Sequence, residues 1–163
     1  MKKILFVCTG NTCRSCMAEG IFRSIVEKDE SLKNKYLAVS AGISAYGGGS
    51  ASNNAVEALR SDWGIDISFH RAIQLEQKEA EEAYLILTMT RRHKEAIASA
   101  YPWLREKVFT LKEYAGEDAW NPQYNEYNYL LDIADPFGMS LQEYKKCARE
   151  IKAAVEKLIG KLP

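Results

Sequence analysis

A cysteine and an arginine lie close together near the start of the chain. Cys8 follows a short apolar run, Ile4 to Val7, and five residues separate it from Arg14. Such a run indicates a buried strand, so the thiol lies where that strand ends. A thiolate is a strong nucleophile, and a guanidinium presents a planar fork that holds two phosphoryl oxygens at once. The pair is therefore suited to phosphoryl transfer to sulfur.

The residues between this pair are expected to form a phosphate-binding loop. A helical pattern begins near Ser15, which is a residue type that caps helix N-termini. Backbone N–H groups of a loop at a helix N-terminus form a concave, partly positive anion site. Gly10 lets the backbone approach a ligand closely, and the same N–H donors stabilise the thiolate of Cys8. The predicted phosphate-binding residues are Thr9, Gly10, Asn11, Thr12, Cys13, Arg14 and Ser15.

Composition limits the class of protein. A length of 163 residues favours a single domain over residues 1–163 with a substantial core. Hydrophobic residues make up 47% of the chain and the net charge is zero, which argues against disorder and against nucleic-acid or membrane partners. The four cysteines are unevenly spaced, unlike a secreted disulfide framework, and the first apolar run is too short for a signal peptide. We expect a cytoplasmic monomer in reducing surroundings.

Apolar runs and helical periodicities alternate along the chain. This alternation predicts an α/β fold, a single-domain three-layer sandwich with a four-stranded parallel sheet and helices on both faces. Ligands of such folds bind at the carboxyl ends of strands, where Cys8 lies. The last helix is expected to begin at a Ser140 cap, residues 91–94 are expected on a solvated helix start, and residues 117–129 on a long surface loop. The other predicted strands cover residues 37–41, 84–89 and 108–111, and the other predicted helices end at residue 26 or cover residues 55–63, 74–83 and 91–100.

The order of these motifs resembles that of the low-molecular-weight protein tyrosine phosphatases. The resemblance rests on Cys8 and Arg14-Ser15 directly after the first strand, and on Asp135-Pro136 just before the last helix. It extends to Ser40-Ala41-Gly42 after the second strand and covers the whole chain in order. The resemblance implies that Asp135 is the general acid, that the reaction passes through a phosphocysteine, and that no metal or other cofactor is needed.

Within that family the chain resembles the bacterial protein arginine phosphatases. Tyrosine-directed members usually carry an apolar β-branched residue where this chain has Thr12, and the resemblance implies that Thr12 helps to admit phosphoarginine. Phosphorylated proteins would then be the substrates and inorganic phosphate the product. A tyrosine phosphatase stays open as the alternative, because residues 117–129 are long for the arginine-directed group. The other segments that carry this resemblance are residues 87–90, 108–114 and 135–138.

The resemblance also implies roles in support of the loop. Asn11 is expected to bond within the loop and to Ser40, which would hold the shape of the loop. The Ser15 hydroxyl is expected to donate to the sulfur of Cys8 and keep it anionic. These side chains would therefore hold the loop in shape and activate the nucleophile.

Further residues are expected beside the site. Cys13 matches the second loop cysteine of the family, which can trap oxidised Cys8 as a reversible disulfide. Cys16 stands where the family often has proline, so it adds a third thiol whose role the sequence leaves open. Phe137 and Tyr46 are expected at the pocket entrance, although Tyr46 also fits an ordinary surface tyrosine.

Three alternatives use the same residues differently. Cys8, Cys13 and Cys16 have the spacing C-x₄-C-x₂-C, which would suit an iron–sulfur protein with distant Cys147 as fourth ligand. The Cys13-x-x-Cys16 pair would suit a thiol–disulfide oxidoreductase. A non-catalytic anion-binding module would use the loop alone, but it needs neither Cys8 nor Asp135. The presence of both residues favours catalysis.

Overall fold

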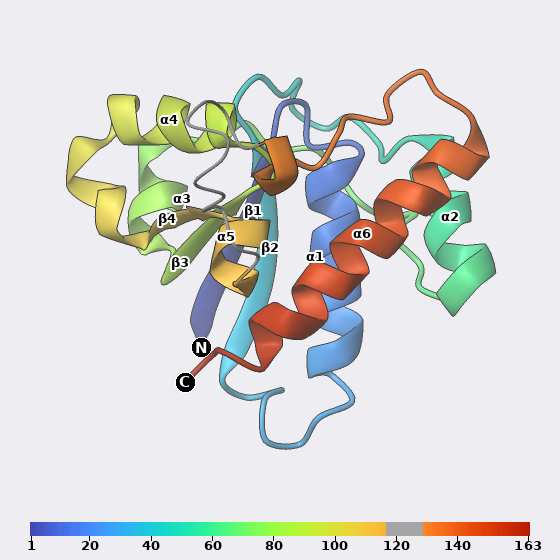
Figure 1. Cartoon of the computed structure of the whole chain (residues 1–163), viewed down its shortest axis with the longest axis horizontal. Coiled ribbons are helices and arrows are strands. Elements are labelled where there is room, and N and C mark those ends of the chain that lie inside the picture. Colours follow the sequence, from blue (N-terminus) through green and yellow to red (C-terminus); the bar gives the residue numbers. More distant parts are fainter. Residues whose placement is uncertain (117–128) are drawn as a thin grey trace, which may run out of the picture.

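The computed structural model describes residues 1–116 and 129–163, so most of the loop predicted over residues 117–129 lies outside the described residues. One sheet forms the centre of the molecule (Figure 1). Its strands run parallel in the order β2-β1-β3-β4, which confirms the predicted four-stranded parallel sheet. The strands are β1 (Lys2–Cys8), β2 (Tyr36–Gly42), β3 (Leu85–Thr88) and β4 (Val108–Thr110).

Helices cover both faces of this sheet, as Figure 1 shows, and the predicted three-layer α/β sandwich is confirmed. One face carries α1 (Arg14–Val26), α2 (Asn53–Trp63), α5 (Leu111–Ala115) and α6 (Leu141–Ile159). The other face carries α3 (Gln77–Glu82), α4 (Arg91–Ala100) and the 3-10 helix η1 (Pro102–Lys107), and a second 3-10 helix, η2 (Tyr129–Leu131), precedes α6.

The first strand shows why both faces are covered. Ile4 and Phe6 pack into the cluster that contains α1, α2 and α6, whereas Leu5 and Val7 pack on the opposite side beside α4. Successive side chains of a strand point to opposite faces of the sheet. A strand that is apolar at every position therefore requires helices on both sides.

Three segments that are distant in sequence meet at the carboxyl end of β1. This edge lies at the top of Figure 1, where the loops after β1 and β2 and the segment before α6 come together. The Ser44 N–H donates to the Thr9 carbonyl over 2.9 Å, and the Ile133 N–H donates to the Met89 carbonyl over 2.8 Å. Backbone hydrogen bonds thus join the first loop to the second, and the residue that follows β3 to the third segment.

Two helix starts differ from the predictions. Ser15 does not cap α1, because Cys13 is the N-cap residue and Ser15 lies buried inside the first turn. The strand predicted over residues 108–111 ends at Thr110, whose hydroxyl accepts a hydrogen bond from the Glu113 N–H. Glu113 in turn accepts from the Thr110 N–H, and this capping box starts α5, a helix that the sequence pattern did not indicate.

The end of α2 and the start of α6 agree with the predicted helix over residues 55–63 and with the predicted Ser140 cap. Gly64 ends α2 with a φ of 65°, a left-handed conformation that glycine adopts at little cost. The Ser140 hydroxyl accepts a hydrogen bond from the Glu143 N–H at the start of α6. The predicted acidic helix over residues 74–83 is shorter, because Gln74 pairs with Gly42 in an isolated bridge before α3 begins.

Candidate active site

The first loop surrounds a pocket of about 420 Å³ at the carboxyl end of β1. Cys8, Arg14 and Asp135, the three residues predicted to be catalytic, all lie in its wall although 121 positions separate the last two. The chain brings them together because β1 and the segment before α6 end at the same edge of the sheet. The pocket is lined by Cys8, Thr9, Gly10, Thr12, Cys13, Arg14, Ser44, Tyr46, Gly49, Asp135 and Phe137.

Arg14 is held in place yet keeps a free donor. Its guanidinium is almost fully buried, with Nη1 donating to the Ile133 carbonyl over 2.9 Å. Its Nη2 lies 3.3 Å from Oδ2 of Asp135, whose side chain is half-exposed. The buried Nε has no hydrogen-bond partner among the described residues. A buried donor without a partner is costly, so the site is arranged for an anion that accepts this hydrogen bond.

The Cys8 sulfur has a hydroxyl partner whose direction can be deduced. Sγ of Cys8 lies 2.9 Å from Oγ of Ser15, and Nδ2 of Asn11 donates to the same Oγ over 2.8 Å. Because the Ser15 oxygen already accepts from Asn11, its own hydrogen is free to point at the sulfur. The hydroxyl therefore stabilises a thiolate, and this use explains why Ser15 does not cap α1.

Asn11 organises the interior of the loop. Its φ of 57° lies in the left-handed region, which asparagine tolerates better than most residues other than glycine. The fully buried side chain donates to Oγ of Ser40 over 2.9 Å and accepts from the Ile73 N–H over 2.9 Å. Ser40 donates onward to Oε2 of Glu19 over 2.5 Å. The structure thus brings Asn11, Ser15 and Ser40 together behind the pocket.

Gly42 provides space for the loop, and we predict that a methyl group there disrupts the site. A Cβ on Gly42 would lie 2.5 Å from the Thr9 carbonyl oxygen and 3.0 Å from the Asn11 nitrogen. Because both are backbone atoms, Gly42→Ala should displace the loop and lower kcat/KM by about 10- to 100-fold. Steady-state kinetics and thermal melting measure the effect. The matched control is Gly47→Ala, where nothing lies within 4 Å; equal activity of the two variants would contradict the prediction.

Two histidines contact the loop, and sequence reasoning gave neither a role. Nε2 of His70 lies 2.6 Å from the Asn11 carbonyl oxygen, and Nε2 of His93 lies 2.9 Å from Oγ1 of Thr9. The prediction that residues 91–94 form a solvated helix start is wrong for His93, which is 4% exposed. The place of His93 in the sequence could have indicated its contact with the loop, because it follows closely after the predicted strand over residues 84–89. That strand ends at the same edge of the sheet as Cys8.

The buried His93 should make the protein sensitive to acid. Burial, reinforced by the nearby Arg14 guanidinium, lowers the pKa of His93 from 6.5 to about 4. Between about pH 6.5 and pH 4, His93 binds a proton in the unfolded chain but not in the folded chain. The free energy of unfolding therefore falls as the pH falls through this range. From pH 7 to pH 5 this site should cost roughly 1–2 kcal/mol after allowance for solvent near the ring.

Urea unfolding of wild type and His93→Gln at both pH values measures this contribution. The glutamine variant cannot bind the proton, so its loss of stability between pH 7 and pH 5 should be smaller than that of wild type. Equal losses in the two proteins would contradict the prediction.

The remaining thiols are buried and free. Sγ of Cys13 lies 3.2 Å from the Tyr144 hydroxyl, and Sγ of Cys16 donates to the Cys13 carbonyl over 3.1 Å. Burial raises the pKa of Cys16 well above its usual value and raises the pKa of Cys147 to about 12, so both stay protonated. Thiolate is the form that ligates metals. In the described part of the chain, no group of three or more His, Cys, Asp or Glu residues is arranged to hold a metal ion.

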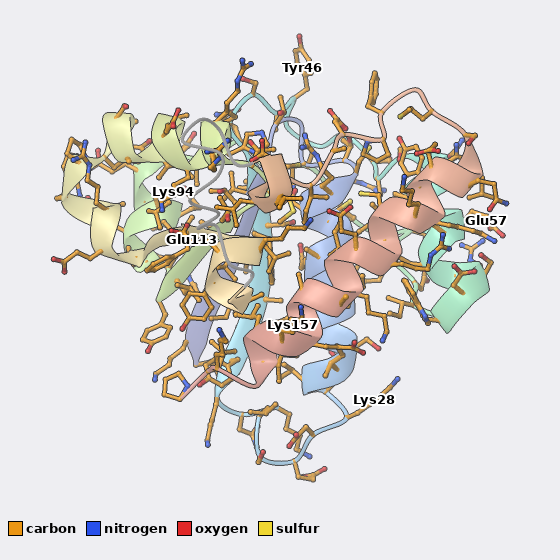
Figure 2. All side chains as sticks on the ribbon, in the orientation of Figure 1. Lys28, Tyr46, Glu57, Lys94, Glu113 and Lys157 are labelled. Atoms are coloured by element: carbon orange, nitrogen blue, oxygen red, sulfur yellow. The ribbon has the colours of Figure 1, made fainter. Side chains whose placement is uncertain are left out.

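Aromatic side chains stand at the pocket mouth. Tyr46 is 93% exposed and Phe137 is 73% exposed, and Figure 2 shows Tyr46 projecting from the top edge of the molecule. Both line the pocket, in the region where they were expected. Thr12 is half-buried, with its methyl group 3.9 Å from where a Cβ on Gly49 would lie. The pocket wall therefore combines the buried Cys8 and Arg14 side chains with two exposed aromatic rings.

Comparisons with known proteins find relatives that match nearly the whole chain. Residues 3–163 match the family model described as low molecular weight phosphotyrosine protein phosphatase. The chain is 40% identical to the protein-arginine-phosphatase of Bacillus subtilis (strain 168) over 159 residues, which cover 98% of this chain and 95% of that protein. The crystal structure of a low molecular weight protein tyrosine phosphatase from T. tengcongensis superimposes with a TM-score of 0.86 at 43% identity, covering 99% of this chain and 100% of the other.

A further solved structure that resembles this chain carries a phosphoryl group. It is a cysteine-to-serine mutant of YwlE arginine phosphatase that carries a phosphorylated active-site serine. This structure superimposes with a TM-score of 0.85 at 40% identity and covers 98% of this chain and 95% of its own.

Proposed function

The chain belongs to the low molecular weight phosphotyrosine protein phosphatase family and is a phosphoprotein phosphatase, and we propose that it hydrolyses phosphoarginine in proteins. The observation that carries the chemistry is the pocket shared by Cys8, Arg14 and Asp135. The arginine specificity is supported by the 40% identity to a protein-arginine-phosphatase and by Thr12 in the pocket wall.

In the first step, the Cys8 thiolate attacks phosphorus opposite the leaving group. The phosphorus–sulfur bond forms as the phosphorus–nitrogen bond of phosphoarginine breaks, and Asp135 gives its proton to the departing guanidine nitrogen. Loop N–H groups and Nε of Arg14 hold the phosphoryl oxygens as charge redistributes in the transition state. The Ser15 hydroxyl, 2.9 Å from the sulfur, keeps the nucleophile anionic before the attack.

In the second step, water hydrolyses the phosphocysteine. Asp135, now a carboxylate, removes a proton from the water that attacks phosphorus. The phosphorus–sulfur bond breaks, the sulfur leaves as a thiolate and inorganic phosphate is released. The phosphorylated serine in the related YwlE mutant supports a covalent phosphoenzyme at this position. Both steps use residues of this chain and leave it unchanged.

Thr12 is proposed to select phosphoarginine, which predicts a change of preference on substitution. Thr12→Ile should depress phosphoarginine turnover, improve phosphotyrosine turnover and shift the ratio of their kcat/KM values by about tenfold or more, the usual size of a pocket contact. The measurement is phosphate release from both phosphoamino acids. Thr12→Val, which keeps the β-branched shape but lacks the hydroxyl, separates the effect of shape from that of polarity. An unchanged ratio in Thr12→Ile would show that Thr12 is not the selector.

A tyrosine phosphatase is the second candidate. The exposed rings of Tyr46 and Phe137 at the pocket mouth suit an aromatic phosphoester, and the related T. tengcongensis structure is described as a tyrosine phosphatase. A wild-type preference for phosphotyrosine over phosphoarginine in the same assay would establish this alternative.

The proposed setting is a monomeric enzyme in the cytoplasm that acts on phosphorylated proteins and releases inorganic phosphate. Four free cysteines suit a reducing compartment. Within residues 1–116 and 129–163, no helix is long and apolar enough to cross a membrane. The proposed mechanism uses no cofactor, nucleic acid or membrane.

A further inference from the structure

A buried histidine contacts the residue that follows the nucleophile. Nε2 of His93 lies 2.9 Å from Oγ1 of Thr9, and Thr9 lines the pocket beside Cys8. His93 is 4% exposed, and no step of the proposed mechanism uses it. The contact joins α4 to the phosphate-binding loop across 84 positions of sequence.

His93 is held firmly by its own helix. Its N–H donates to the hydroxyl of Thr90, the N-cap residue of α4, over 3.2 Å. The next residue, Lys94, forms an ion pair with Glu113 at 2.8 Å, and Figure 2 shows these two labelled side chains between α4 and α5. The first turn of α4, which carries the imidazole, is therefore held by the Thr90 cap and by the ion pair of Lys94 with Glu113.

The hydrogen on the imidazole can be assigned. The pKa of His93, lowered by burial to about 4, leaves the ring neutral at pH 7 with a single N–H. Nδ1 is buried and has no partner among the described residues. An unpaired buried N–H is rarer than an unpaired acceptor, so we assign the hydrogen to Nε2. His93 then donates to Thr9, and the Thr9 oxygen accepts.

The backbone of Thr9 has little freedom, so the hydroxyl is the part that His93 can direct. The Thr9 carbonyl accepts from the Ser44 N–H over 2.9 Å, and Gly42 packs tightly against the same carbonyl. With its oxygen accepting from His93, the hydroxyl of Thr9 has its own hydrogen left for another acceptor. Thr9 is exposed in the pocket wall, where the acceptor is a phosphoryl oxygen of the bound substrate.

We propose that His93 is a positioning residue that directs the Thr9 hydroxyl as an added donor to the phosphoryl group. This proposal deepens the phosphatase function proposed above: it gives the side chain of Thr9, a predicted phosphate-binding residue, a role of its own and adds His93 to phosphoryl recognition. A hydrogen bond to a charged acceptor strengthens binding more than one between neutral groups. The pair should therefore strengthen binding of inorganic phosphate, the product, as well as substrate turnover.

The test is a double-mutant cycle in the full chain with inorganic phosphate as the ligand. Thr9→Val removes the hydroxyl at an exposed position, and His93→Phe removes the N–H donor while it keeps a ring in the core. Each variant should raise the Kd for phosphate, measured by calorimetry, by about tenfold. Each should also lower kcat/KM for p-nitrophenyl phosphate by about tenfold. His93→Gln, whose amide can donate in place of Nε2, should stay within about threefold of wild type. Glu95→Gln, exposed on the same helix, is the control.

The double variant distinguishes positioning from simple damage. If His93 acts through Thr9, the double variant should bind phosphate no more weakly than Thr9→Val alone. Losses that multiply to about 100-fold, a His93→Gln variant as poor as His93→Phe, or unchanged phosphate binding in Thr9→Val would each overturn the proposal. Phosphate binding is measured without turnover, so the cycle tests the His93–Thr9 pair independently of catalysis. If the wild-type protein bound phosphate but cleaved no phosphoester, the proposed function would be wrong, and the cycle would still test this pair.

Discussion

Cys8→Ser should abolish turnover of phosphoarginine and phosphotyrosine alike, by at least about 10⁴-fold in kcat. Serine fits the space of the cysteine, so Arg14, Ser15 and Asp135 keep their positions. A hydroxyl holds its proton far more tightly than a thiol, and the loop donors that favour a thiolate cannot supply an alkoxide at neutral pH. The variant should therefore fold and bind phosphate but fail to turn over, which phosphate-release assays and circular dichroism can establish.

The way in which this variant fails is also informative. Slow attack by the new hydroxyl should leave a stable phosphoserine, as in the related YwlE mutant, and intact-protein mass spectrometry would detect one added phosphoryl group. The matched thiol control is Cys147→Ser, the same exchange at a cysteine that is buried on α6 and does not line the pocket. Its Sγ lies 3.8 Å from the Ala134 carbonyl, a hydrogen bond that a serine hydroxyl can also donate, so turnover should continue because the nucleophile is untouched. Sustained turnover by Cys8→Ser would refute covalent catalysis at position 8.

Patterns that depend on one local rule were predictable from the sequence. The apolar run over Ile4 to Val7 indicated a strand buried on both faces, and its packing into two clusters bears this out. The place of Cys8 at the ligand-binding edge followed from a general property of parallel sheets, since strand ends gather at one edge. That Asp135 joins Cys8 in the pocket was implied by the family resemblance, because Asp135 lies between η2 and α6 and follows no strand.

Features that arise from tertiary contacts were not predictable in the same way. Ser15 has the right type for a helix cap, yet its hydroxyl accepts from Asn11 and contacts Cys8 inside the loop, a contact expected from the family resemblance and not from the local cap pattern. The importance of Gly42 comes from the backbone of another segment, which lies too close for a Cβ. His93 looked like part of a basic surface run because nothing local indicates that its ring faces Thr9. In each case, the deciding partner is distant in sequence or belongs to the folded loop.

Asp135→Asn should reveal both proton transfers of the proposed mechanism. The amide keeps the size of the carboxyl group and its place 3.3 Å from Arg14, but it can neither give nor take a proton. With phosphoarginine, whose leaving guanidine needs a proton, kcat should fall by about 10²- to 10⁴-fold. With p-nitrophenyl phosphate, whose leaving phenolate is stable without one, formation of the phosphocysteine should proceed while its hydrolysis stalls, because water has lost its general base.

A rapid burst of p-nitrophenol that matches the enzyme concentration, followed by a slow steady state, is therefore expected for Asp135→Asn. Mass spectrometry during the steady state should find the phosphoenzyme. Asp132→Asn is the matched control, since Asp132 accepts from the Arg91 N–H over 2.9 Å and is not in the pocket wall; an amide oxygen can still accept that hydrogen bond. Equal losses on both substrates without a burst, or an equal defect in Asp132→Asn, would remove Asp135 from both steps. Because the two steps need opposite protonation states of one carboxyl group, the dependence on leaving group tests the acid and the base together.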